Sequence, residues 1–263
     1  MTVELLQRLE DGVLVLTLNR PDRLNAFSEG LERALAETVE GAGRDPSVRV
    51  IVVTGAGRAF SAGGDVKTMS AGSDWDRPYA ERVERLRGIN RMVLSLRNVA
   101  KPTMAMVNGV ATGLGCNVAL ACDLRFASAE ARFGMAFVGI GAADDGGGAW
   151  LLPRLIGYGR ALEMLYTARL ILAEDALHWG LVNRVVAAEE LRDVTMGFAH
   201  TLADGPPLAL AALKQAVNRA LHWSFEDLLE YEAQQQAIVL GTRDFGEGVN
   251  AFIERRRPRY EGR

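Results

Sequence analysis

The sequence predicts an α/β fold that ends in a helical segment. In the first half of the chain, short apolar runs typical of buried strands alternate with segments whose apolar residues recur at helical spacing. Two of these runs lead into glycine-rich turns, where α/β proteins usually form binding sites. From about residue 173 the pattern becomes mainly helical. We therefore expect an α/β core over residues 1–200 and a helical segment over residues 201–263.

Apolar runs and turn residues place the individual elements. The expected strands are Val13–Leu18, Val48–Thr54, Pro102–Val107 and Asp123–Ala127. Ser28 can cap a helix that continues to about Glu40, because leucine and valine recur along one face after it. The other expected helices are Tyr79–Leu96, one that opens at Cys116–Ala121, Leu208–Leu221, Phe225–Leu240 and Phe245–Arg255.

Composition excludes several classes of protein. No segment approaches the roughly 20 consecutive apolar residues that a membrane helix needs, and the first residues lack the pattern of a secretory or transit signal. We expect a cytoplasmic protein with no membrane partner. A net charge of −3 with dispersed basic residues argues against nucleic-acid binding. Cys116 and Cys122 lack the neighbouring ligands of a zinc site, so we expect buried thiols and no metal.

Glycine clusters mark three loops that can approach a ligand closely. They cover residues 55–65, 108–115 and 139–148. The first lacks the lysine and hydroxyl residue that end a P-loop, and its spacing does not fit a dinucleotide fingerprint. These loops therefore predict a binding site that does not depend on a phosphate cradle.

The first two loops occur together with other short motifs in a fixed order. The motifs are Asn19-Arg20-Pro21, Leu24-Asn25-Ala26, Val52-Val53-Thr54-Gly55, Ala59-Phe60-Ser61-Ala62-Gly63-Gly64-Asp65, Lys101-Pro102, Val107-Asn108-Gly109, Cys122-Asp123, Gly180-Leu181-Val182 and Phe252-Ile253-Glu254-Arg255-Arg256. Over nearly its whole length the sequence thereby resembles the crotonase (enoyl-CoA hydratase/isomerase) superfamily. The resemblance implies a spiral of ββα units with a C-terminal helical segment used for trimerisation. It also implies an acyl-CoA thioester substrate, no cofactor beyond the coenzyme A of that substrate, and a homotrimer or dimer of trimers.

The resemblance assigns two backbone amides, those of Gly64 and Leu114, to an oxyanion hole. When a proton leaves the carbon beside a thioester, negative charge collects on the carbonyl oxygen, and fixed N–H donors stabilise it. Most relatives have glycine where this chain has Leu114, but the main-chain N–H is the same. The resemblance also places the carbonyl of Ala62 near the adenine of coenzyme A, with Arg23 and Leu24 along the cofactor.

The hydratase glutamates of the family are replaced in this chain. At the matching positions stand Asn117 and Phe137, which cannot exchange a proton at neutral pH. The sequence therefore disfavours ordinary hydration. Both residues are candidates for substrate contact, and for Asn117 a structural role is an equal alternative.

A different carboxylate, Asp145, fits the single catalytic aspartate of the ring-epoxide phenylacetyl-CoA isomerase type, because the flanks 133–137 and 150–154 align without a gap. One carboxylate suffices to move a double bond, since it can take a proton from one carbon and return it to another. Burial among aromatic side chains would raise its pKa. The alternative is that Asp145 only caps the helix that starts near Gly147, while we expect Asp144 in a turn or at the surface.

The sequence thus predicts an acyl-CoA isomerase that relocates a double bond or rearranges a ring through a thioester enolate. Two alternatives stay open at this point. In an aryl-CoA dehalogenase or hydrolase, Asp145 would act as a nucleophile. A non-catalytic acyl-CoA-binding homologue would explain the loss of both glutamates.

Overall fold

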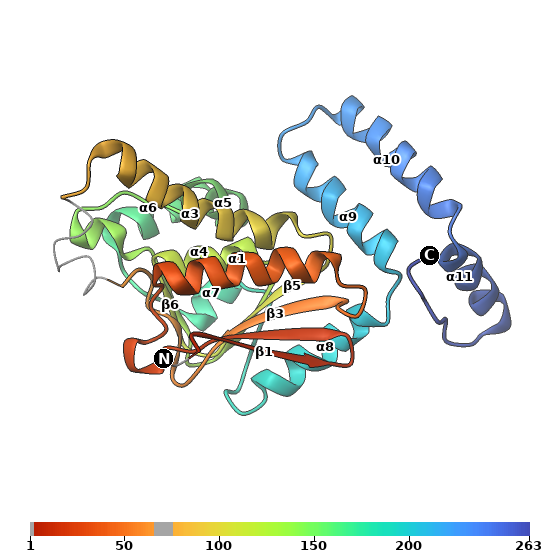
Figure 1. The fold of residues 1–263 in the computed structure, drawn as a ribbon, viewed down its shortest axis with the longest axis horizontal. Coiled ribbons are helices and arrows are strands. Elements are labelled where there is room, and N and C mark those ends of the chain that lie inside the picture. Colours follow the sequence, from red (N-terminus) through yellow and green to blue (C-terminus); the bar gives the residue numbers. More distant parts are fainter. Residues whose placement is uncertain (1–2, 66–75) are drawn as a thin grey trace.

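Two sheets form the body of the protein in the computed structural model, which describes residues 3–65 and 76–263 (Figure 1). Within these residues the larger sheet has the strand order β1-β2-β3-β5-β7-β10 and the smaller sheet the order β4-β6-β8-β9. All neighbouring strands are parallel except the pairs β1–β2 and β8–β9. The larger sheet consists of β1 (Leu5–Glu10), β2 (Val13–Leu18), β3 (Val50–Gly55), β5 (Thr103–Val107), β7 (Leu124–Ser128) and β10 (Arg184–Val186). The smaller sheet consists of β4 (Ala59–Ser61), β6 (Val110–Thr112), β8 (Arg132–Gly134) and β9 (Ile171–Leu172).

Helices cover both faces of the larger sheet, with α1 and α3 on one face and α8 on the other (Figure 1). The α-helices are α1 (Glu29–Arg44), α3 (Tyr79–Asn98), α4 (Leu114–Ala121), α5 (Gly148–Ile156), α6 (Tyr158–Thr167), α7 (Ala173–Trp179), α8 (Leu191–Ala203), α9 (Pro207–Ala220), α10 (Phe225–Leu240) and α11 (Arg243–Glu254). The described residues also form two short 3-10 helices, η1 (Pro21–Arg23) and η3 (Ala136–Ile140), which lie in loops. Ser28 caps α1 as predicted, since its hydroxyl accepts from the amide of Leu31 at 3.0 Å.

The central strands are apolar along their whole length because both of their faces are covered. In β3, Ile51 and Val53 join the core beneath α1 and α3, whereas Val50 and Val52 join the core beneath α8. This alternation is the period of a strand, in which successive side chains point to opposite faces. Burial on both sides therefore explains the nearly continuous apolar runs that the sequence shows.

A repeated unit connects the two sheets. Each of β3, β5 and β7 is followed by a short strand of the smaller sheet, respectively β4, β6 and β8, and then by a helical segment. The crossings between sheets are tight: a Cβ on Gly55 would collide with the carbonyl of Ala59, and a Cβ on Gly109 with the carbonyl of Arg58. The predicted α/β class and the ββα unit are confirmed, and the turns that follow β4 and β6 are brought together.

The sequence prediction missed short strands in two regions. The loops 55–65 and 108–115 each contain a short strand, β4 and β6, which are only three residues long and give no readable periodicity. The region after residue 173 is mainly helical, as predicted, and it also contains the short strand β10, which pairs with β7. Both errors concern strands that are too short to identify without their partners.

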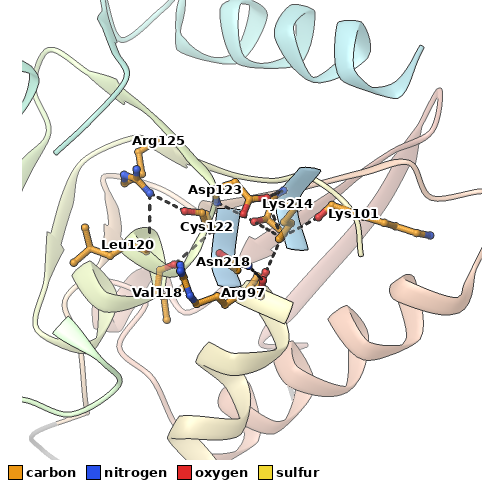
Figure 2. Close-up of polar contacts among 11 residues, drawn as sticks. Arg97, Lys101, Val118, Leu120, Cys122, Asp123, Arg125, Lys214 and Asn218 are labelled. Atoms are coloured by element: carbon orange, nitrogen blue, oxygen red, sulfur yellow. Dashed lines mark hydrogen bonds and ion pairs between the residues drawn. The ribbon is translucent and has the colours of Figure 1, made fainter. Parts of the chain in front are cut away.

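The last three helices, α9 to α11, extend away from the sheets (Figure 1). The buried ammonium of Lys214 anchors α9: it pairs with Asp123 at 2.9 Å and donates to the carbonyl oxygens of Leu96 and Lys101 (Figure 2). Asn218, one helical turn later, donates to the carbonyl of Arg97. Figure 2 shows that these contacts join α9 to the C-terminal end of α3 and the start of β7.

Large apolar side chains are exposed on the outermost helices. Phe225 in α10 is 71% exposed, and Phe252 in α11 is 87% exposed. The trimer that the sequence predicts remains a prediction, and these faces are its candidate contacts. None of the described helices is both long and apolar enough to cross a membrane.

Candidate active site

The two glycine-rich turns touch each other at Gly63 and Gly113. Both residues have positive φ, +93° and +54°. A Cβ on Gly63 would lie 2.7 Å from the carbonyl oxygen of Thr112 and 3.4 Å from the amide nitrogen of Leu114. Only glycine fits this contact, because a side chain would both strain the backbone and push the turns apart. The turn that carries Gly64 therefore lies directly against the start of α4.

The amides of Gly64 and Leu114 donate to no acceptor in the part of the protein that the structure describes. Leu114 is the first residue of α4, so its N–H has no acceptor within the helix. Among the residues that the structure describes, neither amide donates a hydrogen bond. The N-terminus of α4 also contributes a partial positive charge at this place. The two N–H groups are thus available to an oxygen that carries negative charge.

The three residues that the sequence places along coenzyme A lie beside the first glycine-rich turn. The amide of Ala62 donates to the carbonyl of Leu24 at 2.9 Å, and the amide of Phe27 donates to the carbonyl of Gly63 at 2.7 Å. Arg23, at the end of η1, is exposed beside this pairing. The structure therefore brings Ala62 together with Arg23 and Leu24.

The adjacent aspartates Asp144 and Asp145 have different environments. Asp144 caps α5: its carboxylate accepts from the amide of Ala149 at 2.7 Å and from the side chain of Asn117 at 3.0 Å. Burial raises the pKa of Asp144, and these hydrogen bonds oppose the rise. Asp144, and not Asp145, therefore makes the helix cap that the sequence offers as an alternative role for Asp145. Asp144 thus has a structural role beyond the turn or surface position that the sequence predicts for it.

Asp145 has no such partners among the described residues. One of its carboxylate oxygens, Oδ1, is buried and receives no hydrogen bond from them. The pKa of Asp145 is raised to about 6, mainly by burial and then by the negative charges of Asp144 and Glu32, whereas the positive charge of Arg85 opposes the rise. A carboxylate with such a pKa can both take up and release a proton near neutral pH.

Asn117 supports the loop that carries both aspartates. Its side chain is fully buried, and its amide group donates to the carboxylate of Asp144 and to the main-chain carbonyl of Asp145. Its Oδ1 lies against Gly148, where a Cβ would overlap it, and accepts no hydrogen bond from the described residues. Both donors of this candidate substrate-binding residue are thus engaged within the protein.

Phe137 forms an apolar wall beside the second glycine turn. It belongs to η3, packs against the main core, and has its ring edge 3.8 Å from the position of a Cβ on Gly113. A side chain at this place can contact a group bound near Leu114 without taking part in proton transfer. The substrate contact that the sequence predicts for Phe137 remains a prediction.

Sequence reasoning missed the ion pair between Glu32 in α1 and Arg85 in α3. The guanidinium of Arg85 donates to both carboxylate oxygens of Glu32, at 2.6 and 2.8 Å, and Glu32 is buried. Both charges influence the pKa of Asp145. No sequence signal could have linked them, because the two residues are 53 positions apart and lie on different helices.

Comparison with known proteins assigns the family. Residues 8–263 match the family described as enoyl-CoA hydratase/isomerase. The chain belongs to this family. The crotonase-superfamily resemblance that the sequence predicts is thereby confirmed, over nearly the whole chain.

Relatives within the enoyl-CoA hydratase/isomerase family include different enzymes. The chain is 38% identical to the 1,2-epoxyphenylacetyl-CoA isomerase of Escherichia coli K12, with 98% of each chain covered. It is 35% identical to the short-chain-enoyl-CoA hydratase of Clostridium acetobutylicum, with 94% of each covered. Its fold matches an enoyl-CoA hydratase subunit from Geobacillus kaustophilus with a TM-score of 0.91 and 39% identity, over 99% of each chain. The family therefore includes isomerases and hydratases, and the site residues must distinguish them.

Proposed function

We propose that the protein is an acyl-CoA isomerase that relocates a double bond or rearranges a ring, with Asp145 as its single acid and base. The observation that carries the proposal is the carboxylate of Asp145, whose pKa is about 6 and whose Oδ1 accepts no hydrogen bond from the described residues. The replacement of both hydratase glutamates, by Asn117 and Phe137, supports the same reaction class.

In the proposed reaction, the N–H groups of Gly64 and Leu114 bind the thioester carbonyl oxygen. The ionised carboxylate of Asp145 removes a proton from the α carbon, or from the γ carbon of an α,β-unsaturated thioester. The electron pair then moves onto the carbonyl oxygen, which forms an enolate. Each amide lowers the barrier by about 3 kcal/mol, because it needs no reorganisation when the charge forms. The protonated Asp145 then returns the proton to another carbon, which moves the double bond without adding water.

Neighbouring residues fix the position of Asp145 and raise its pKa. Asn117 holds the main-chain carbonyl of Asp145, and the charge of Asp144 raises the pKa of the proposed base. Phe137 supplies an apolar wall that limits access of water to an enolate near Leu114.

The substitution Asp145→Asn tests the proposal, with Asp144→Asn as the matched control. The assay measures double-bond migration in unsaturated acyl-CoA thioesters. Uptake of solvent deuterium at the α or γ carbon is measured as a second readout. We expect Asp145→Asn to lose roughly 10²-fold or more in kcat, because the general base is gone. Asp144→Asn keeps most activity, since an amide oxygen can still cap α5.

Three results would contradict the proposal. In the first, Asp145→Asn retains activity within about threefold of wild type, less than the loss of a general base causes. In the second, mass spectrometry detects an aryl or acyl adduct on Asp145, which would favour the nucleophilic alternative. In the third, tight acyl-CoA binding without any deuterium uptake would favour a non-catalytic homologue.

A further inference from the structure

A cavity of about 540 Å³ lies where α3, α5 and α9 meet. Its lining includes Arg97, Trp150, Asn218, His222 and Trp223. This volume is typical of pockets that hold a small organic molecule or part of one. The walls combine flat aromatic rings with a cation, and Trp150 stacks on His222 with 5.1 Å between ring centroids.

The guanidinium of Arg97 is the unusual group in this cavity. It has neither a hydrogen bond nor an ion pair with any residue that the structure describes, and its Cζ lies 4.8 Å from the ring centroid of Trp150. The other strong cations nearby are occupied: Lys214 pairs with Asp123 (Figure 2), and Arg219 donates to Gln215. A partly buried guanidinium without partners is costly unless a ligand supplies them.

The surroundings of Arg97 hold it in place but do not neutralise it. Asn218 donates to the main-chain carbonyl of Arg97 at 3.1 Å, a contact that holds the helix backbone and does not involve the guanidinium (Figure 2). Burial lowers the pKa of Arg97, the charge of Asp123 opposes this effect, and the charge of Arg154 reinforces it. An anion bound at the guanidinium would offset this loss of hydration.

The cavity borders the Asp145 loop. Gly147 lines it, and so does Val93, which would lie 3.5 Å from a Cβ on Gly146. Arg97 follows Val93 by four residues on α3 and therefore lies on the same face of that helix, one turn further from the start of the helix. A group that enters past the Asp145 loop would meet Val93 first and the guanidinium next.

We propose that this cavity binds the carboxylate of a small organic anion, with Arg97 as its ligand. A guanidinium can bind a carboxylate through two parallel hydrogen bonds, and the rings of Trp150 and Trp223 suit the flat or aliphatic part of such a molecule. The carboxylate is either the distal end of the acyl group of the substrate or a free organic acid. The first source rests on the proposed acyl-CoA function, and the second does not.

Calorimetry on the whole protein distinguishes these sources. The first pair of probes is adipyl-CoA and hexanoyl-CoA, which have the same number of acyl carbons but differ in the terminal carboxylate. Both are saturated, so their binding can be measured without turnover. The second pair is benzoate and benzyl alcohol, which tests a free acid against a neutral molecule of similar shape.

The variant is Arg97→Gln, and its matched control is Arg154→Gln. The guanidinium of Arg154 also lies over Trp150, at 3.9 Å, but it donates to a main-chain carbonyl and is absent from the cavity lining. Arg97→Lys retains the charge without the paired geometry, and it replaces the Gln variant if that protein does not fold. Thermal unfolding of each variant establishes that it is folded.

We expect wild type and Arg154→Gln to bind one carboxylate probe about tenfold or more tightly than its neutral match, and Arg97→Gln to lose this preference. Preference for adipyl-CoA identifies the acyl end as the source, and preference for benzoate identifies a free acid. If neither preference depends on Arg97, the carboxylate site is refuted. If wild type and the Arg97 variant bind both acyl-CoA probes equally, the acyl end is refuted as the source of the carboxylate and the isomerase proposal is unaffected. If neither protein binds any acyl-CoA, the isomerase proposal is contradicted.

Discussion

Replacing Leu114 by proline removes one main-chain N–H of the proposed oxyanion hole while leaving the rest of the helix start in place. Proline is well tolerated at the first position of a helix, where its missing N–H would have no intrahelical partner. Leu114 is this first residue of α4. The preceding residue, Gly113, has φ 54° and ψ −127° and no Cβ to clash with the proline ring. The substitution is therefore compatible with the backbone.

The structure separates the effect on rate from the effect on stability. Because no described residue accepts from the Leu114 amide, its loss breaks no internal hydrogen bond. The side chain is 2% exposed, so truncating it costs about 2–4 kcal/mol of stability. Leu114→Ala loses the same packing but keeps the main-chain N–H, so it is the matched control. Loss of one oxyanion donor should lower kcat about 10²–10³-fold, or roughly 3–4 kcal/mol in the barrier.

The assay compares kcat for double-bond migration in the two variants, with urea unfolding of each. We expect both variants to be destabilised by similar amounts, and only Leu114→Pro to lose roughly 10²-fold or more in kcat. If the proline variant is folded and its kcat lies within about threefold of that of Leu114→Ala, the Leu114 amide does not stabilise the transition state.

Other predictions concern the two aspartates and the contact between the turns. Because the reacting form of Asp145 is ionised and its pKa is raised to about 6, kcat/KM rises with pH up to about 6 and then levels off. Asp144→Asn removes a charge that raises this pKa, so the profile moves to lower pH; an unmoved profile contradicts the assignment. The raised pKa also means that the native state binds the proton more tightly than the unfolded chain, so stability falls as pH rises from the ordinary aspartate value to about 6. Asp145→Asn therefore stabilises the protein at pH 7 by roughly 1–2 kcal/mol after allowance for solvent screening, as measured by urea unfolding; a destabilised variant contradicts this sign. Gly63→Ala places a Cβ 2.7 Å from the carbonyl of Thr112 at a positive φ, and we expect a loss of at least about 2 kcal/mol together with most activity. Gly41→Ala, in open space on α1, is the control and should be neutral or slightly stabilising in the same unfolding assay.

The contact of the two turns shows what local sequence can and cannot predict. Glycine clusters identify backbones that can turn sharply, and their order with the other motifs indicates the family. The reason for glycine at position 63 is a carbonyl of a different loop, that of Thr112, and this contact exists only once β4 and β6 pair. The same holds for the short strands themselves, which have too few residues for a periodic signal.

Asp144 and Asp145 show most clearly which properties follow from the sequence and which follow only from the tertiary structure. The sequence alone showed a carboxylate at position 145 and the alternation of strands and helices, because these depend on residue identity and local periodicity, and its family resemblance predicts that the hydratase glutamates are replaced. Only the tertiary structure decided that Asp144 caps α5 and that Asp145 has a pKa of about 6. Burial, the charge of the neighbouring Asp144 and the charges of Glu32 and Arg85 set that pKa, and the last two residues lie on helices that are distant in sequence. A pKa depends on solvent exclusion and on charges within a few ångströms, which arise only when those segments pack together.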